Sequence, residues 1–214
     1  MIVGLVGFIG SGKGTIADIL VKYHGFFKES YANSVKDACA VIFGWDRELL
    51  EGTTPESREW RETVDSWWSK QLGREFSPRL ALQLMGTEAG RDVFHPDLWV
   101  HTVMRRCRSD ANYVIADVRF PNEINAIKNS GGYIIRVRRG DDPDWFDLAL
   151  TCNVNNKHEI MHNAYPELHY SEWAWIGAHY EIILNNDCNI EELKIRVDNV
   201  IDCLYTNCVE SIEV

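Results

Sequence analysis

The sequence lacks the long apolar run that a membrane span requires. A transmembrane helix needs ~20 consecutive apolar residues, and no run in these 214 residues comes near that length. The opening segment also lacks the charged, apolar and small-residue order of an export signal. We therefore expect a cytoplasmic protein with no membrane partner.

Cysteine pairs at metal-binding spacing are absent as well. None of the six cysteines lies in a C-x-x-C pair, which argues against a zinc ribbon and a disulfide framework. We expect reduced thiols that behave mostly as small buried hydrophobic residues. They are Cys39, Cys107, Cys152, Cys188, Cys203 and Cys208.

Positive charge is scarce. The chain has 22 basic and 32 acidic side chains and a formal net charge of −10. Such a chain repels nucleic acid unless its cations are gathered locally. We expect no nucleic-acid partner, and any anionic ligand should be small and held by a few focused positive groups.

The strongest motif is the segment GFIGSGKGT at residues 7–15. It follows a short apolar run, Ile2–Val6, that is typical of a buried parallel strand, and it precedes a helical pattern that stops at Gly25. The glycines let backbone N–H groups surround phosphate oxygens, and the lysine adds a point charge for the terminal phosphates. This is the context that a P-loop requires. The residues expected to bind ATP here are Gly10, Ser11, Gly12, Lys13, Gly14 and Thr15.

The rest of the chain predicts a parallel sheet with helical crossovers. Strands are expected at 113–116, 133–137 and 180–184, and helices at 34–43, 98–106, 122–129 and 190–204. The middle of the chain reads as helical, with Pro55 and Pro78 in first-turn positions. The predicted fold class is α/β: one P-loop NTPase-type domain over 1–214, with a mostly parallel sheet flanked by helices. Residues 45–110 form a helical insertion, and 138–175 a lid or loop region.

An acidic residue and an arginine follow the second predicted strand. Asp117 can hold Mg²⁺ together with Thr15, and Arg119 offers a planar fork for transferring phosphate oxygens. The alternative for Asp117 is an aspartate that caps the next helix. Glu123 belongs either to the helix face or to the support of Arg119. The expected catalytic residues are Lys13, Asp117 and Arg119.

Further segments carry a resemblance to a known family. The loop variant GKGT at 12–15 resembles that of adenylate kinase and its relatives. The segments YANSVK at 31–36, RLALQLMGTEAGR at 79–91, DVRFPNE at 117–123 and HYSEW at 169–173 follow in order. Together they resemble the bacteriophage deoxynucleoside monophosphate kinases from residue 1 to about 173. Many members carry an acidic residue where this chain has Gly14.

The resemblance implies a P-loop fold, phosphoryl transfer from ATP to a deoxynucleoside monophosphate (dNMP), Mg²⁺, and often a homodimer. An acceptor monophosphate carries nearly two negative charges, so a second cationic cluster is expected. The candidates for dNMP binding are Lys36, Arg79, Gln83, Arg91, Asp97 and Trp99. Simple surface solvation is the alternative for the cations, and a core position is the alternative for Trp99.

Arg138 and Arg139 begin a polar segment that suits a lid closing over the ATP phosphates. Ser171 and Glu172 come from the family motif alone, with a supporting role. Arg79 and Arg91 lie on a predicted helical segment at a spacing that roughly keeps one face.

Three rival functions remain open from the sequence. One is a P-loop kinase for another small acceptor, and another is a nucleotide sensor without turnover. The third is a zinc hydrolase, because residues 158–162 read HEIMH and match the H-E-x-x-H pattern. Asn153–Asn156 precedes this pattern and Pro166 follows it closely, which favours a polar loop with two exposed histidines.

Overall fold

The computed structural model describes residues 1–206 and 212–213. The chain divides into two compact units, one made of Met1–Ser30 with Arg106–Val214 and the other of Tyr31–Arg105. The first unit contains the whole sheet, and the second is helical.

The sheet of the first unit has six parallel strands in the order β2-β3-β1-β4-β5-β6. The strands are β1 (Ile2–Val6), β2 (Phe27–Glu29), β3 (Tyr113–Ile115), β4 (Tyr133–Arg138), β5 (Ile182–Asn185) and β6 (Ile212–Glu213). The predicted parallel sheet is therefore confirmed. The sequence did not predict β2, whose first two residues are exposed and which therefore shows no buried apolar run.

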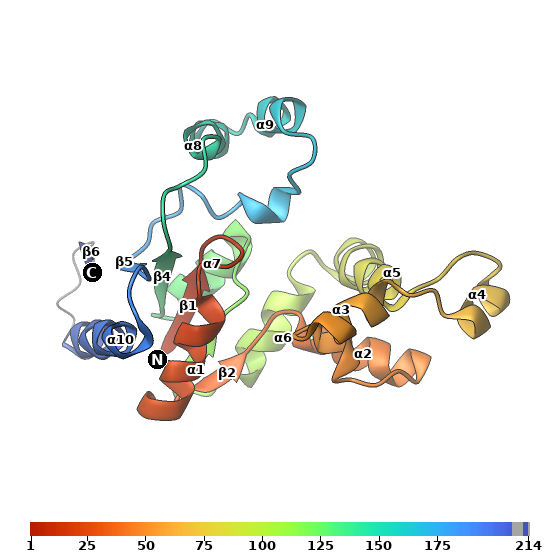
Figure 1. Ribbon diagram of the computed structural model, residues 1–214, viewed down its shortest axis with the longest axis horizontal. Coiled ribbons are helices and arrows are strands. Elements are labelled where there is room, and N and C mark those ends of the chain that lie inside the picture. The colour runs from red at the N-terminus through yellow and green to blue at the C-terminus, as the bar shows by residue number, and fades with distance from the viewer. Residues whose placement is uncertain (207–211, 214) are drawn as a thin grey trace. The chain divides into compact units, whose positions relative to one another are not determined.

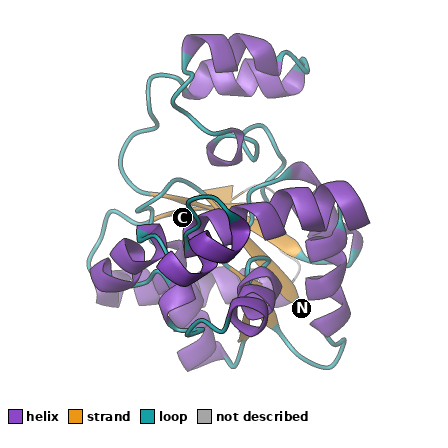
Figure 2. Cartoon of the chain, turned by 90° about the vertical axis from the view of Figure 1, so that its right-hand side faces the viewer, coloured by secondary structure: helices purple, strands orange, loops and turns teal. Residues whose placement is uncertain are grey.

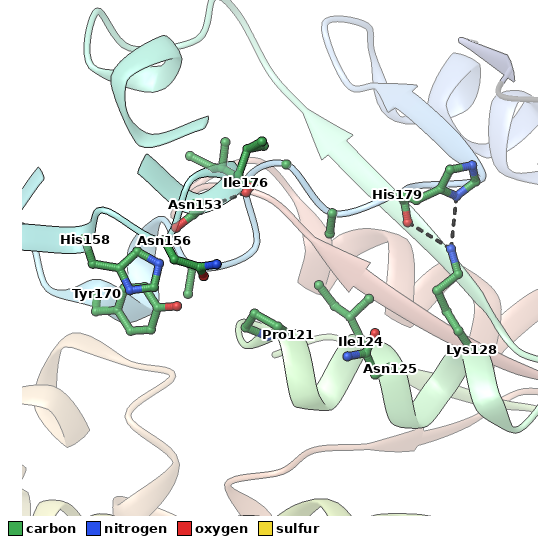
Figure 3. Close-up of a pocket in the computed structure, with 14 residues that line it drawn as sticks. Pro121, Ile124, Asn125, Lys128, Asn153, Asn156, His158, Tyr170, Ile176 and His179 are labelled. Atoms are coloured by element: carbon green, nitrogen blue, oxygen red, sulfur yellow. Dashed lines mark hydrogen bonds between the residues drawn. The ribbon is translucent and has the colours of Figure 1, made fainter. Parts of the chain in front are cut away.

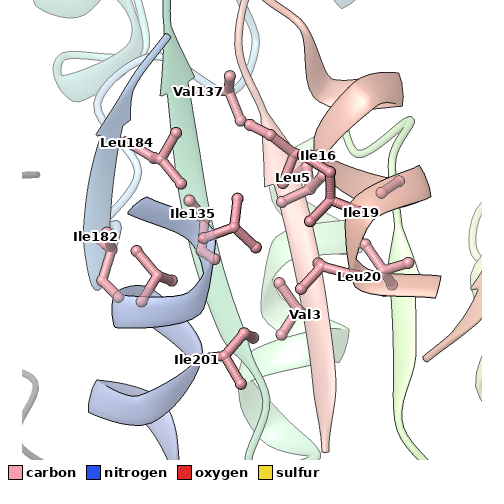
Figure 4. Close-up of a cluster of buried hydrophobic side chains, with 14 of the residues drawn as sticks. Val3, Leu5, Ile16, Ile19, Leu20, Ile135, Val137, Ile182, Leu184 and Ile201 are labelled. Carbon is pink, nitrogen blue, oxygen red and sulfur yellow. The ribbon is translucent and has the colours of Figure 1, made fainter. Parts of the chain in front are cut away.

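Helices cover both faces of the sheet (Figures 1 and 4). On one face α1 (Lys13–His24) and α10 (Ile190–Tyr205) bury Ile16, Leu20 and Ile201 against Val3 and other strand residues. On the other face lies α7 (Pro121–Asn129). A Cβ on Gly4 of β1 would lie 2.6 Å from the Ile127 side chain of α7, so this close approach requires glycine.

The second unit consists of short helices around its own core of buried aromatic and aliphatic side chains. The helices are α2 (Asn33–Phe43), α3 (Pro55–Glu62), α4 (Ser66–Leu72), α5 (Pro78–Leu84), α6 (Leu98–Arg106) and the one-turn η1 (Leu49–Glu51). Thr54 caps α3 and Ser77 caps α5, each with proline at the first helical position, as predicted.

A π-helix, η2 (Met85–Phe94), continues directly from α5. Its hydrogen bonds run from residue i to i+5 instead of i+4, so the backbone turns differently from an α-helix. The segment that carries Arg79 and Arg91 is therefore helical, as predicted, but it changes from an α-helix to a π-helix between them.

The segment between β4 and β5 holds two helices, α8 (Phe146–Val154) and α9 (His158–Ala164), and the short η3 (Tyr170–Glu172). Figures 1 and 2 show α8 and α9 packed together beyond the sheet and joined to it by loops. The prediction of a polar loop at 158–162 is wrong, because a seven-residue helix fits between the Asn-rich segment and Pro166.

The described cysteines are all free thiols. Two of them, Cys39 and Cys152, are buried, and three are only partly buried: Cys107, Cys188 and Cys203. Fewer of the described cysteines are therefore buried than the sequence analysis expected. Cys208 lies outside the described residues. Within the described part of the chain, no helix combines the length and the apolar character needed to cross a membrane.

Candidate active site

The glycine-rich loop joins β1 to α1. Gly7, Gly10 and Gly12 have φ values of 142°, 82° and 99°, in the region that side chains other than glycine rarely adopt. A Cβ on Gly7 would lie 2.3 Å from the Val137 carbonyl oxygen. The sequence therefore requires glycine here for both conformation and space. The Ile16 N–H donates to the Gly12 carbonyl at 3.0 Å, so α1 begins directly after the loop.

The Lys13 side chain folds back over this loop. Its Nζ donates to the carbonyl oxygens of Gly7 and Phe8, each at 2.7 Å. Burial, and then the nearby positive charge of Arg119, lower the pKa of Lys13 from 10.5 to about 8. The ammonium group is thus held at the loop, ready to meet an anion.

A small cavity opens beside the loop. It has a volume of about 80 Å³, and its lining includes Lys13, Asp117 and Arg119 together with Ser171 and Glu172. Lys13 begins α1 directly after the loop that follows β1, Asp117 and Arg119 follow β3, and the last two residues lie in η3. The carboxyl ends of adjacent parallel strands meet at one edge of the sheet, which explains why the first three converge.

Asp117 follows β3 and is partly buried. Its carboxylate Oδ2 accepts a hydrogen bond from the Ser30 hydroxyl at 2.6 Å. Ser30 comes directly after β2, the strand beside β3, and sequence reasoning missed it. A carboxylate next to a hydroxyl supplies hard oxygen atoms at the edge of the cavity.

The backbone of Arg119 is fixed by a buried carboxylate. Glu123, 2% exposed, accepts the N–H groups of Arg119 at 2.7 Å and Phe120 at 3.0 Å. The guanidinium of Arg119 stays exposed, and its Nη1 donates to the Ser171 hydroxyl at 3.3 Å. Glu123 therefore holds the backbone of Arg119, and Ser171 contacts its side chain.

Three residues that the sequence did not single out also contact the loop. The Asn186 Nδ2 donates to the Ser11 carbonyl at 2.8 Å, from a buried position just after β5. The Phe8 ring meets Trp145 and Trp175 with ring centroids 5.3 and 5.0 Å apart. No local sequence signal marks these contacts, because the partners lie far apart in the chain.

Thr15 is exposed in the first turn of α1. Arg138 is partly buried and its Nε donates to the Gly140 carbonyl at 3.4 Å, whereas Arg139 is exposed. In the described part of the chain these three side chains are not among those that line the cavity.

The second unit contains the residues predicted to bind the acceptor. The Lys36 Nζ donates to the Glu51 carboxylate at 2.6 Å and is largely buried. Arg79, whose side chain is 58% exposed, lies 3.9 Å from Glu62. Gln83 is exposed, and Arg91 and Asp97 are partly buried.

Trp99 is a core residue of the second unit. Its ring is 8% exposed, and its indole Nε1 donates to the Gly86 carbonyl at 2.8 Å. A Cβ on Gly90 would lie 2.5 Å from the ring. Of the two alternatives for Trp99, contact with the dNMP and a core position, the structure shows the core position.

The H-E-x-x-H pattern lies beside a second cavity of about 410 Å³ between α7 and the segment 153–179 (Figure 3). The ring of His158 lies 5.0 Å from that of Tyr170. The Lys128 ammonium is bound to Glu181 at 2.8 Å. Among the described residues, neither His158 nor His162 belongs to a group of three potential ligands close enough to share a metal ion.

Comparison with known proteins gives two relatives that match this chain over most of its length. A protein of Acanthamoeba polyphaga mimivirus, provisionally named deoxynucleotide monophosphate kinase, is 35% identical over 190 residues, which cover 80% of this chain and 93% of the relative. The deoxynucleoside-5'-monophosphate kinase of Escherichia phage T5 is 28% identical, and the match covers 94% of this chain and 96% of the relative.

No model of a known protein family matches the chain. Among solved structures, shikimate kinase from Aquifex aeolicus gives a TM-score of 0.45 at 16% identity, over 97% of this chain and 98% of that one. Dephospho-CoA kinase from Campylobacter jejuni gives 0.45 at 13% identity, over 96% of this chain and 98% of that one. Because the mimivirus relative is 35% identical over 80% of this chain, the chain belongs to the deoxynucleotide monophosphate kinase family.

Proposed function

We propose that this protein transfers the γ-phosphate of ATP to a deoxynucleoside monophosphate and releases ADP and a deoxynucleoside diphosphate. The observation that carries the proposal is the convergence of Lys13, Asp117 and Arg119 on one cavity beside a glycine-rich loop. The relatives are named for deoxynucleotide monophosphate kinase activity, which supports the choice of acceptor.

The reaction is a direct in-line transfer. An oxygen of the acceptor phosphate attacks the γ-phosphorus of ATP as the bond to the β-phosphate oxygen breaks, and no covalent enzyme intermediate forms. Lys13 and Arg119 neutralise charge that spreads over the transferring oxygens. No strong general base is needed, because the second pKa of a phosphate is ~6 and the attacking group is already ionised at pH 7.

The oxygen atoms at the cavity edge fit a magnesium ion. Mg²⁺ prefers carboxylate and phosphate oxygens and keeps several waters. Asp117 and Thr15 are the residues proposed to hold it, with the Ser30 hydroxyl fixing the Asp117 carboxylate. When bound with ATP, Mg²⁺ would offset negative charge on the β- and γ-phosphates.

Further residues are proposed to cover ATP and to bind the acceptor. Arg138, Arg139 and the segment up to 175 act as a lid over ATP, and Arg79, Gln83, Arg91 and Asp97 bind the acceptor. The protein acts as a homodimer in the cytoplasm. Light scattering after gel filtration, which gives the mass in solution, tests the dimer.

The affinity for ATP should depend on the charge of Lys13. The pKa of Lys13 is lowered to about 8, so the ammonium form prevails below that pH and the neutral amine above it. Because the phosphates bind the ammonium, kcat/KM for ATP should fall as pH rises through about 8. Initial rates from pH 6 to pH 10 check this. A flat profile across that range would contradict the role of Lys13.

Replacing Lys36 with alanine should raise the KM for the dNMP by about ten- to a hundredfold and leave the KM for ATP nearly unchanged. A hydrogen bond from a charged donor to the acceptor phosphate would be lost. The measurement is initial rates at varied dNMP and at varied ATP.

The matched control for this variant is Glu51→Gln, which removes the charge partner of Lys36 and keeps its ammonium. It should not raise the dNMP KM. Equal increases in both KM values for Lys36→Ala would show that Lys36 supports the fold instead of the acceptor site.

The acceptor class is tested by a phosphorylation screen. ATP is offered with each dNMP, with ribonucleoside monophosphates and with small alcohols, and the products are separated by chromatography. Product formation with dNMPs supports the proposal. Phosphorylation of an alcohol alone would assign the site to another small acceptor, and ATP binding without turnover would assign it to a sensor.

A further inference from the structure

Three potential metal ligands lie together at the start of α6, in the second unit. One ligand atom from each of His95, Asp97 and His101 lies within 4.8 Å of the other two. Both histidines are exposed, and Asp97 is partly buried. None of the three lines the cavity beside the glycine-rich loop, although Asp97 is also one of the residues proposed to bind the acceptor.

The backbone holds these side chains in place. The Leu98 N–H donates to the His95 carbonyl at 2.9 Å, and the His101 N–H donates to the Asp97 carbonyl at 2.8 Å. The centroids of the two imidazole rings lie 5.5 Å apart, with the ring planes tilted by 40°. His95 and Asp97 lie just before α6, and His101 lies in its first turn. A metal ion could therefore bind to all three with little rearrangement of the chain.

We propose that His95, Asp97 and His101 form a site for a transition-metal ion of the Zn²⁺ class. Two imidazole nitrogens and one carboxylate oxygen are a ligand set that Zn²⁺ uses with a fourth position left for water. Imidazole also suits Cu²⁺ and Ni²⁺, whereas Mg²⁺ prefers oxygen ligands. The site is thus chemically distinct from the Mg²⁺ proposed to accompany ATP.

Metal binding would change the hydrogen bond between Asp97 and His95. The Asp97 N–H donates to His95 Nδ1 at 3.0 Å. A metal ion on Nδ1 takes the place of this N–H. A metal ion on Nε2 of a neutral ring puts the ring proton on Nδ1, which then has no lone pair to accept. In both cases the Asp97 amide loses its acceptor, so its NMR signal should shift on Zn²⁺ addition.

The test is a Zn²⁺ titration of the full chain by calorimetry, after chelator treatment and without nucleotide. The expected result is saturation at one Zn²⁺ per chain, with affinity lowered about tenfold or more in both His95→Ala and His101→Ala. Millimolar Mg²⁺ should not compete. The chelator-treated protein is used throughout, and thermal unfolding of each variant confirms that it is folded. Where an alanine variant unfolds, glutamine at the same position replaces it.

The matched control is His162→Ala, an exposed histidine in the H-E-x-x-H pattern of α9. It should bind Zn²⁺ like the unchanged protein. Loss of binding in this variant, unchanged binding in His95→Ala and His101→Ala, or no binding at all would each overturn the proposal. Because no nucleotide is present, these outcomes are independent of the proposed kinase reaction.

Discussion

Lys13→Ala should reduce kcat by about a hundred- to a thousandfold or more and leave the fold intact. The ammonium group is held at the loop by the Gly7 and Phe8 carbonyls, where it can neutralise the terminal phosphates of ATP. Its removal takes away charge stabilisation that grows in the transition state. The measurement is formation of the deoxynucleoside diphosphate at saturating substrates.

The fold should tolerate this change. Desolvation lowers the pKa of Lys13, so the charged form is disfavoured by its surroundings and alanine relieves that cost. Lys22→Ala, an exposed lysine on the same helix, is the control and should keep full activity. A Lys13→Ala protein that is folded and turns over at the normal rate would refute the proposed role.

Arg119→Ala should lower kcat by about a hundredfold or more, with a smaller effect on either KM. The guanidinium is exposed beside the cavity, and its backbone is fixed by Glu123, so truncation removes a charge without disturbing a buried group. Single-turnover rates with bound ATP and dNMP separate the chemical step from binding.

The conservative variant distinguishes charge from shape. Arg119→Lys keeps one positive charge but loses the planar fork, so it should recover only part of the rate. Arg108→Ala removes another exposed arginine of the same unit, one paired with Asp110, and should have no effect. If Arg119→Ala matched the unchanged protein in the single-turnover rate, Arg119 would have no part in the transfer.

The sheet and the loop could be predicted because their signals are local. Ile2–Val6 is a short apolar run followed by Gly7, and the lysine and following helix complete the pattern within a few residues. The position of Asp117 also followed from a local signal, the end of a buried strand. By contrast, β2 begins with exposed residues and has no apolar run that would mark it as a strand. It is a strand because it pairs with β3, which is distant in sequence.

The supporting residues of the site could not be predicted in the same way. Ser30 contacts Asp117, and Asn186 contacts Ser11, because parallel strands bring these residues together. The spacing of these residues along the chain does not predict either contact. For Trp99 the sequence left two positions open, the acceptor site and the core. The close approach of Gly90 and the hydrogen bond to Gly86 place its ring in the core.

The most direct test of the account is transfer of a labelled γ-phosphate. The protein is mixed with ATP labelled at that phosphorus, Mg²⁺ and one dNMP, and the products are separated after a single turnover. We expect the label to appear as the β-phosphate of the deoxynucleoside diphosphate, in a one-to-one ratio to ADP. The Lys13→Ala variant should form little of this labelled product. Label released as inorganic phosphate at the same rate with and without dNMP would contradict the account.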